Sequence, residues 1–239
     1  MKTEMRAEHW QNPLHTELWA ARTEALGYLE SQRPTQLAIL LRTLRLIDES
    51  VDAYESLAGD DVYARICGLT LLKAKHLALG AYSLILDGLG QESGGLLRPF
   101  IEYVELLTYL RKNPEMASRA AENDLPKAGE RAKAIGGIYK DFRSYLNSHA
   151  SHSSYSEYAL SHLLEPNTFR FKKLQRAVPQ VLDANVRDYA IQIYLLAQES
   201  VLSLERISPT SFEVLATQTD QLRIDLLQAF ELHAEQHRP

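Results

Sequence analysis

Residues 60–88 read DDVYARICGLTLLKAKHLALGAYSLILDG. Apolar side chains recur through this stretch at helical spacing and cover most sides of the predicted helix: Ile66, Leu69, Leu72, Leu77, Leu79, Leu84 and Leu86. A helix that is apolar on most sides needs packing partners on most sides, so the stretch predicts a central element of a helical bundle. We expect Asp60 to cap its N-terminus and the glycines between Gly88 and Gly95 to end it.

Helical patterns extend in both directions from this central segment. The further expected helices are one that follows Asn12 and Pro13, one from Pro34 to Gly59, one from near Pro99 to Asn113, a helical region at about 126–148, and two helices at 183–206 and 210–237 separated by Pro209. No alternating strand pattern is present. The sequence predicts an all-α antiparallel bundle of about six to nine helices in one domain, 1–239, with a core at about 34–206 and a C-terminal helix at about 210–237.

Composition fits a globular protein, because 45% of the 239 residues are apolar and 24% are charged. Cys67 is the only cysteine, which excludes an intrachain disulfide and a cysteine-based zinc site, and we expect it to be a small core residue. No apolar run marks a signal peptide, and no window approaches the roughly 20 apolar residues of a membrane span. We therefore expect a cytoplasmic protein that needs no cofactor.

Net charge argues against a surface built wholly for nucleic acid, since the chain carries −5 at pH 7. The segment from 127 to 188 nevertheless has ten basic and six acidic residues and is +4. Such an imbalance fits either an anionic ligand or ordinary amphipathic helices.

A polar stripe runs along the predicted helix that ends at Asn113. Arg98, Glu102, Glu105 and Tyr109 fall within about 60° of one another around its axis. One interpretation is a solvated strip in which Arg98 and Glu102 form an i,i+4 ion pair. The other is that so apolar a helix is not peripheral, so that Arg98 and Glu102 face a polar pocket and orient another site residue.

The segment from Tyr139 to Tyr158, YKDFRSYLNSHASHSSYSEY, gathers titratable and hydroxyl side chains. Cleavage of RNA by its own 2′-hydroxyl needs a base that titrates near neutrality and a fixed cation, which His149 or His152 and Arg143 can supply. On an unbroken helix Arg143 and His149 point about 120° apart. They can converge only if the helix ends near Asn147 or if they meet across a dimer interface.

Three other interpretations of this segment remain open. His149 and His152 could share a metal with His162 and Glu157, but no H-E-x-x-H sequence supports this, and we expect no metal. A pair of Ser148 and His152 lacks a G-x-S-x-G sequence. A plain helix terminus also fits, because serine and asparagine cap helices and histidine favours a helix C-terminus.

A short basic run, FRFKKLQR at 169–176, interleaves aromatic and cationic residues. Its candidate nucleic-acid contacts are Arg170, Lys172, Lys173 and Arg176, a composition suited to phosphate contacts and base stacking. An exposed amphipathic edge has the same composition.

Two segments together resemble a family of uncharacterised bacterial helical proteins. Its helix of the form aliphatic-Leu-Arg-x-x-x-Glu, then Tyr-Leu, is matched by Leu96 to Glu102 with Tyr109 and Leu110, and its later Tyr, Ser and His segment by Tyr139 to His152. This resemblance implies an all-α fold and indicates Arg98, Glu102 and His152 as site residues.

The spacing from Arg143 to His149 is similar to the Arg-x4–6-His motif of HEPN domains, which are helical ribonucleases and nucleotide-binding modules of bacterial toxins and antiviral systems. The resemblance implies a homodimer with both residues at its interface and RNA cleavage without metal. Ser144 departs from it, since a strongly polar residue is usual there. The predicted function is thus a HEPN-like ribonuclease or nucleotide-binding protein, and the alternative is a non-enzymatic adaptor that binds a protein partner.

Overall fold

The computed structural model describes residues 13–149, 163–165, 168, 170–171 and 178–232. These residues form nine helices and no β-strand: α2 (Pro13–Gln32), α3 (Pro34–Glu55), α4 (Val62–Leu86), α5 (Gly90–Lys112), α6 (Met116–Ala121), α7 (Ala128–Ala134), α8 (Lys140–His149), α10 (Pro179–Leu204) and α11 (Pro209–Ala229). The predicted all-α helical bundle is confirmed.

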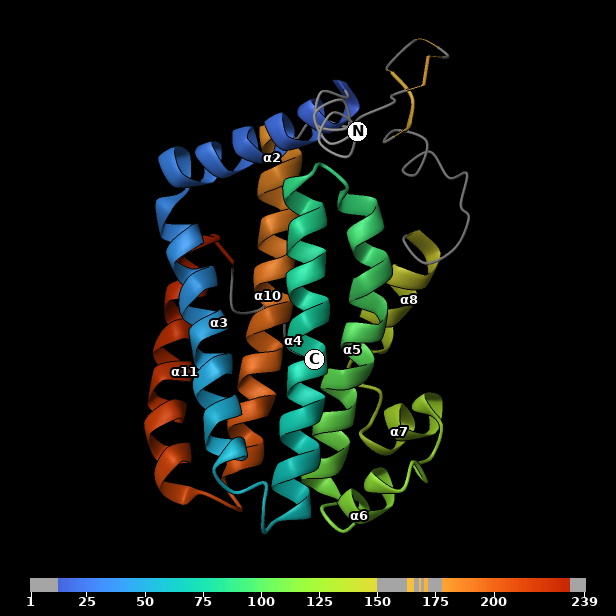
Figure 1. The fold of residues 1–239 in the computed structure, drawn as a ribbon, viewed down its shortest axis with the longest axis vertical. Helices are drawn as coiled ribbons and strands as arrows, with labels where there is room; N and C mark the ends of the chain where they lie inside the picture. The colour runs from blue at the N-terminus through green and yellow to red at the C-terminus, as the bar shows by residue number, and fades with distance from the viewer. Residues whose placement is uncertain (1–12, 150–162, 166–167, 169, 172–177, 233–239) are drawn as a thin grey trace, which may run out of the picture.

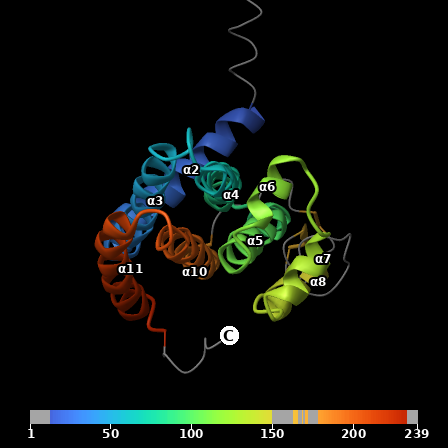
Figure 2. The ribbon, with the colours of Figure 1, turned by 90° about the horizontal axis from the view of Figure 1, so that it is seen from below.

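The five longest helices lie side by side along the molecule and are α3, α4, α5, α10 and α11 (Figure 1). The helix α2 crosses one end of them. Figure 2 shows α10 flanked by α3, α4, α5 and α11, with α7 and α8 on the outer side of α5. The middle of α5 is therefore covered from two directions, by α4 and α10 on one side and by α7 and α8 on the other.

Proline opens four of these helices, as the sequence indicated for the first, second and last of the expected set. Pro34, Pro179 and Pro209 each stand in the first helical turn, where the missing N–H has no intrahelical partner to lose. The N-cap of α4 is Asp61 and not the expected Asp60. Asp61 has the extended backbone of a cap, and its Oδ1 accepts from the N–H groups of Tyr63 and Ala64 at 2.7 and 3.2 Å.

The helix break expected from Gly88 to Gly95 is shorter in the structure. Only Gly88 ends α4, with φ +79° and a hydrogen bond from the Leu89 N–H to the Leu84 carbonyl that closes the helix end. The glycines that follow belong to α5, which begins at Gly90 and contains Pro99 in its interior. Packing against α4 and α10 overrides the weak helix propensity of this stretch.

The predicted region at about 126–148 is two helices rather than one. Gly136 and Gly137 lie between α7 and α8 with φ +87° and +65°, which only glycine adopts readily, so the chain turns there before α8 starts. The last helix ends at Ala229, so its predicted end near 237 is wrong: Glu231 has φ +53° and the Leu232 N–H donates to the Leu227 carbonyl at 2.9 Å, which closes the helix end.

The core is one continuous cluster of buried apolar side chains contributed by all five bundle helices. Its largest members include Tyr54, Phe100 and Tyr189, each at most 1% exposed. Cys67 is fully buried, as expected, and burial raises the pKa of its thiol to about 12.

Among the described helices, α4 alone is long and apolar enough to cross a membrane by length and composition, a candidate that the sequence pattern did not single out. Its best window reaches a mean hydropathy of 1.2, and 39% of that window is buried. In the bundle α4 packs against α3, α5 and α10, which is the position expected for a central helix.

The helices α3 and α4 approach each other closely at Gly68. A Cβ atom at Gly68 would lie 3.0 Å from the Cβ of Tyr54, whose ring is fully buried. That atom is next to the backbone of α3 and has no room to move aside. Gly27 on α2 is the opposite case, because nothing lies within 4 Å of an added Cβ.

We expect these two glycines to respond to alanine with opposite signs. Gly68→Ala lowers the free energy of unfolding by about 1–3 kcal/mol because it overpacks the α3–α4 contact. Gly27→Ala raises it by about 0.5–1 kcal/mol because it removes glycine's entropy cost from an open helix position. Urea unfolding of both variants measures the difference, and destabilisation by Gly27→Ala as large as that by Gly68→Ala would contradict the close approach.

Candidate functional site

The polar stripe of α5 is partly covered in the structure. Glu105 is 2% exposed and Tyr109 is 7% exposed, because α7 and α8 pack on this side of the helix. A solvated strip, the first interpretation of the sequence, does not describe these two positions. These two residues face other parts of the protein, whereas Arg98 and Glu102 stay partly exposed.

Arg98 and Glu102 form the ion pair expected from their i,i+4 spacing. Nη1 of Arg98 donates to Oε1 of Glu102 at 2.5 Å, and the two side chains are 20% and 34% exposed. The pair lies one turn from Glu105 on the same face, so its charges act on that buried carboxylate.

Glu105 binds Arg143, and this contact brings α8 onto α5. Nη1 of Arg143 donates to both carboxylate oxygens, at 3.3 Å to Oε1 and 3.2 Å to Oε2. Nε and Nη2 of the guanidinium do not donate to this carboxylate. The Arg143 side chain is 18% exposed, so it is anchored on the protein at one corner and reaches the surface elsewhere.

Burial is the main influence on Glu105 and raises the pKa of its carboxyl above the ordinary value. The Arg143 guanidinium opposes this rise, both as a charge and as a hydrogen-bond donor. Glu102 adds to the rise by repulsion, and Arg98 reduces it. The partner of Arg143 was missed from the sequence, although an acidic residue on the polar stripe of an apolar helix was a usable signal.

The histidine segment is described only at its start. The helix α8 continues to His149 and does not end near Asn147, so the positions of Arg143 and His149 are separated by about 120° around its axis. The prediction that Arg143 and His149 converge because the helix ends near Asn147 is therefore wrong. His152 lies outside the described residues, as do Glu157 and His162 of the alternative metal site.

Tyr139 is buried just before α8 and stands between two charged pairs. Burial is the largest cause that raises its pKa, to which the Glu199 carboxylate adds, whereas a hydrogen bond with Thr108 lowers it. The charges of Glu105 and Arg111 also act on this hydroxyl. Arg111 and Glu199 form a second ion pair further along α5.

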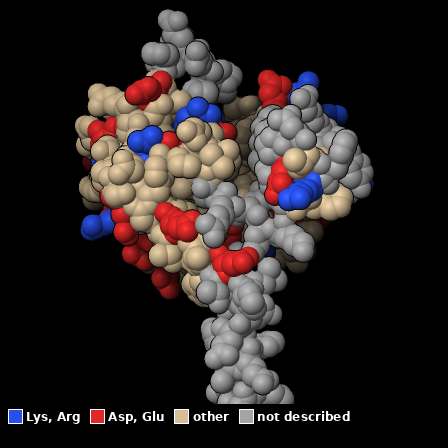
Figure 3. Space-filling model, turned by 90° about the horizontal axis from the view of Figure 1, so that it is seen from above, with Lys and Arg blue, Asp and Glu red and all other residues tan. Residues whose placement is uncertain are grey.

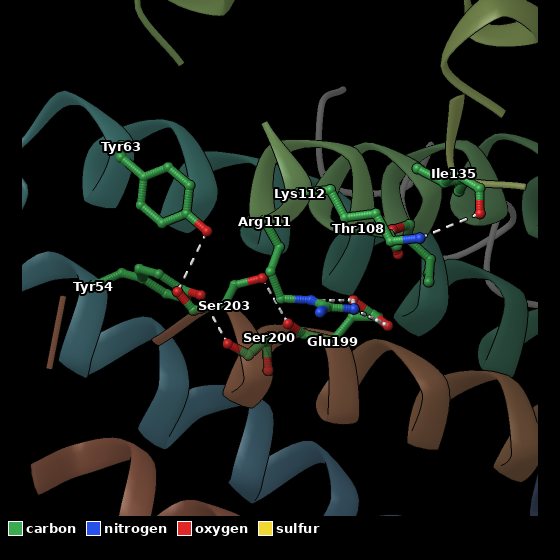
Figure 4. Close-up of polar contacts among 10 residues, drawn as sticks. Tyr54, Tyr63, Thr108, Arg111, Lys112, Ile135, Glu199, Ser200 and Ser203 are labelled. Carbon is green, nitrogen blue, oxygen red and sulfur yellow. Dashed lines mark hydrogen bonds and ion pairs between the residues drawn. The ribbon is translucent and has the colours of Figure 1, made fainter. Parts of the chain in front are cut away.

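This second pair joins α5 to α10 (Figure 4). Nε and Nη2 of Arg111 hold the Glu199 carboxylate with three hydrogen bonds of 3.1–3.2 Å. Glu199 is 8% exposed and lies in the largely buried C-terminal half of α10. Neighbouring contacts tie α7 and α4 to the same region. Nζ of Lys112 donates to the Ile135 carbonyl, and the Tyr63 hydroxyl donates to the Ser203 backbone carbonyl, each at 3.4 Å.

We call the three ion pairs of α5 and the two hydroxyl residues near them the polar seam: Arg98, Glu102, Glu105, Arg143, Tyr139, Thr108, Arg111 and Glu199. The seam can fix the position of α8 and present Arg143 at the surface. Among the described residues no group of three or more His, Cys, Asp or Glu is placed to hold a metal ion.

Of the predicted nucleic-acid contacts, only Arg170 is described, and it is exposed. Lys172, Lys173 and Arg176 lie outside the described residues. Phe171, next to Arg170, is 79% exposed. The structure therefore places the start of the basic run on the surface.

Comparison of the chain with known protein families, with curated proteins and with solved structures finds no match. The resemblances to the uncharacterised helical family and to HEPN domains stay predictions.

Proposed function

We propose that the protein is a HEPN-like, cytoplasmic homodimer of a bacterial stress or defence system that binds RNA or a nucleotide at the face formed by α5 and α8. The observation that supports this most is the attachment of Arg143 to the buried Glu105 through Nη1 alone. A guanidinium fixed at one nitrogen keeps its Nε–Nη2 edge for the two oxygens of a phosphate.

Catalysis in this proposal uses His149 as the base and Arg143 as the cation. His149 removes the proton of the 2′-hydroxyl, and the oxygen attacks the adjacent phosphorus while Arg143 stabilises the charge that develops there. The P–O5′ bond breaks, and the leaving 5′-oxygen takes a proton from water, which leaves a 2′,3′-cyclic phosphate. Because α8 separates the two positions around its axis, His149 comes from the partner copy. His152, Arg98 and Glu102 complete the face, with the carboxylate holding Arg98 in place.

Cleavage of a mixed RNA pool by the purified protein in EDTA tests this function. We expect products with 2′,3′-cyclic phosphate ends, and a rate roughly 10²–10⁴-fold lower in His149→Ala because its base is gone. His152→Ala is run beside it. Arg143→Lys keeps a cation beside Glu105 but loses the planar fork, and is expected to lose activity as well.

Arg187→Lys serves as the control, because Arg187 on α10 is 45% exposed and pairs only with its neighbour Asp188 among the described residues. Equal cleavage by all variants would refute the assigned residues. A wild type that neither cleaves RNA nor binds RNA, ATP or GTP would refute the function.

A non-enzymatic adaptor is the second candidate, and one observation favours it. The two arginines and the two glutamates of the α5–α8 face neutralise one another, so the described part of this face has no excess positive charge. In that case the polar seam only holds α8 in place, and protein inert toward RNA and nucleotides is the expected result.

A further inference from the structure

The outer side of α4 carries a row of exposed apolar side chains. In Figure 1 α4 runs down the front of the bundle between α3 and α5, with no other described helix in front of its middle. Figure 2 shows α10 on the opposite side of α4. The outward residues are exposed or half-buried, and we call them the leucine stripe: Arg65, Leu69, Leu72, His76, Leu79 and Ser83. The residues on the opposite side of the helix are fully buried: Cys67, Leu71, Ala74 and Ala78.

The spacing of the leucine stripe is that of a helix face that pairs with another helix. Its residues follow one another in steps of four and three, as the facing positions of paired helices do. Leu69 and Leu79 are 52% and 41% exposed. Contiguous exposed apolar side chains mark interaction surfaces. From Arg65 to Leu79 the stripe is about 21 Å long, which suits a partner helix of about four turns.

The charge along the leucine stripe is positive. The helix α4 contains three Lys or Arg residues and no acidic residue. Lys75 pairs with Asp48 of α3, whereas Arg65 and Lys73 form no ion pair with any described residue. Arg65 and Lys73 therefore leave a positive charge beside the exposed leucines that an acidic partner can neutralise.

This charge distinguishes between the occupants that the leucine stripe could have. A second copy in a symmetric contact presents the same cations, and like charges repel. A membrane surface extends beyond one helix and meets the exposed Asp52 and Glu55 of α3. Acidic and basic side chains are also interspersed over the described part of the end that carries α2 (Figure 3). The described surface near the stripe therefore lacks the broad positive charge that anionic lipids attract.

We propose that the leucine stripe binds an amphipathic helix of a partner protein, whose apolar side chains cover Leu69, Leu72 and Leu79. Acidic residues on that helix lie beside Arg65 and Lys73. Such a helix buries the leucines and pairs the cations at the same time. The inference goes beyond the proposed function and does not rest on it, because the stripe is on α4 and the proposed RNA face is on α5 and α8.

Fluorescence anisotropy with two labelled synthetic peptides of about three heptads tests the inference. Both peptides carry leucine at positions a and d, and positions e and g are glutamate in one and lysine in the other. We expect the acidic peptide to bind more tightly than the basic peptide by about tenfold or more. Leu69→Ala/Leu79→Ala weakens its binding by about tenfold or more, because two apolar contacts are lost. Lys73→Glu lowers the preference for the acidic peptide by about tenfold.

Val214→Ala/Ile224→Ala is the matched control, because it truncates two side chains of α11 that are 56% and 44% exposed. It should leave peptide binding unchanged. Equal affinity for the two peptides, binding of neither, or unchanged binding by Leu69→Ala/Leu79→Ala would overturn the proposal.

Sedimentation velocity and vesicles of phosphatidylserine test the other two occupants. A wild-type dimer that Leu69→Ala/Leu79→Ala dissociates would assign the leucine stripe to a second copy and overturn the proposal. Vesicle binding that the same variant abolishes would assign the stripe to a membrane surface and overturn it as well. We expect neither result.

Discussion

Replacing Phe100 by alanine lowers the free energy of unfolding by about 3–5 kcal/mol. Phe100 is fully buried on α5 and belongs to the core cluster. The helices packed around its ring cannot easily move to fill the space that the ring leaves. The variant leaves a cavity lined by packed helices, so the lost apolar contacts and the cavity both contribute. Urea unfolding followed by circular dichroism measures the change.

Phe171→Ala provides the same change of side chain at a position that is 79% exposed. We expect its stability to stay within about 0.5 kcal/mol of wild type. Comparable losses in both variants would contradict the difference in burial between the two rings.

Replacing Arg143 by methionine lowers the stability by about 3–5 kcal/mol at neutral pH, because Glu105 is then a buried carboxylate without its cation. The loss of stability caused by Arg143→Met becomes smaller in acid. The folded-state pKa of Glu105 is already raised by burial, and loss of Arg143 raises it further. As the pH falls through this raised value the folded protein takes up a proton, and below the ordinary carboxyl pKa the charge penalty is absent.

Unfolding midpoints in urea between neutral and acid pH measure this prediction. The double variant Arg143→Met/Glu105→Leu is expected to regain most of the stability, since it removes the unpaired charge. Arg187→Met, at an exposed arginine, should change stability by about 0.5 kcal/mol or less. A cost for Arg143→Met that is no larger than this, or that is the same at every pH, would contradict a buried pair.

The helices could be predicted because their signals are local. The apolar periodicity of 60–88 and the prolines at 34 and 209 act on neighbouring residues only, and α3, α4 and α11 begin close to where they were expected. Helix boundaries at glycine could not be predicted in the same way. Whether Gly90 ends a helix or starts one depends on packing against α4 and α10, which no local pattern contains.

The candidate site also contains a local contact that could be predicted and distant contacts that could not. The Arg98–Glu102 pair follows from a spacing of four on one helix, and it is present. The partner of Arg143 is 38 residues away in the sequence, and the partner of Arg111 is 88 residues away. A single sequence gives no means of pairing residues that are so far apart. A charged residue among apolar neighbours in a helix does indicate that it has a partner.

The position of α10 among four other helices affects the order in which the bundle is assembled during synthesis. The helices α3, α4 and α5 follow one another through short connections and can pair while the rest of the chain is still being made. Until α10 emerges, the faces that it later covers remain in contact with water and open to other chains. The cost of closing the long intervening segment grows only slowly with its length, so the late arrival of α10 exposes a nascent chain to aggregation without weakening the finished fold.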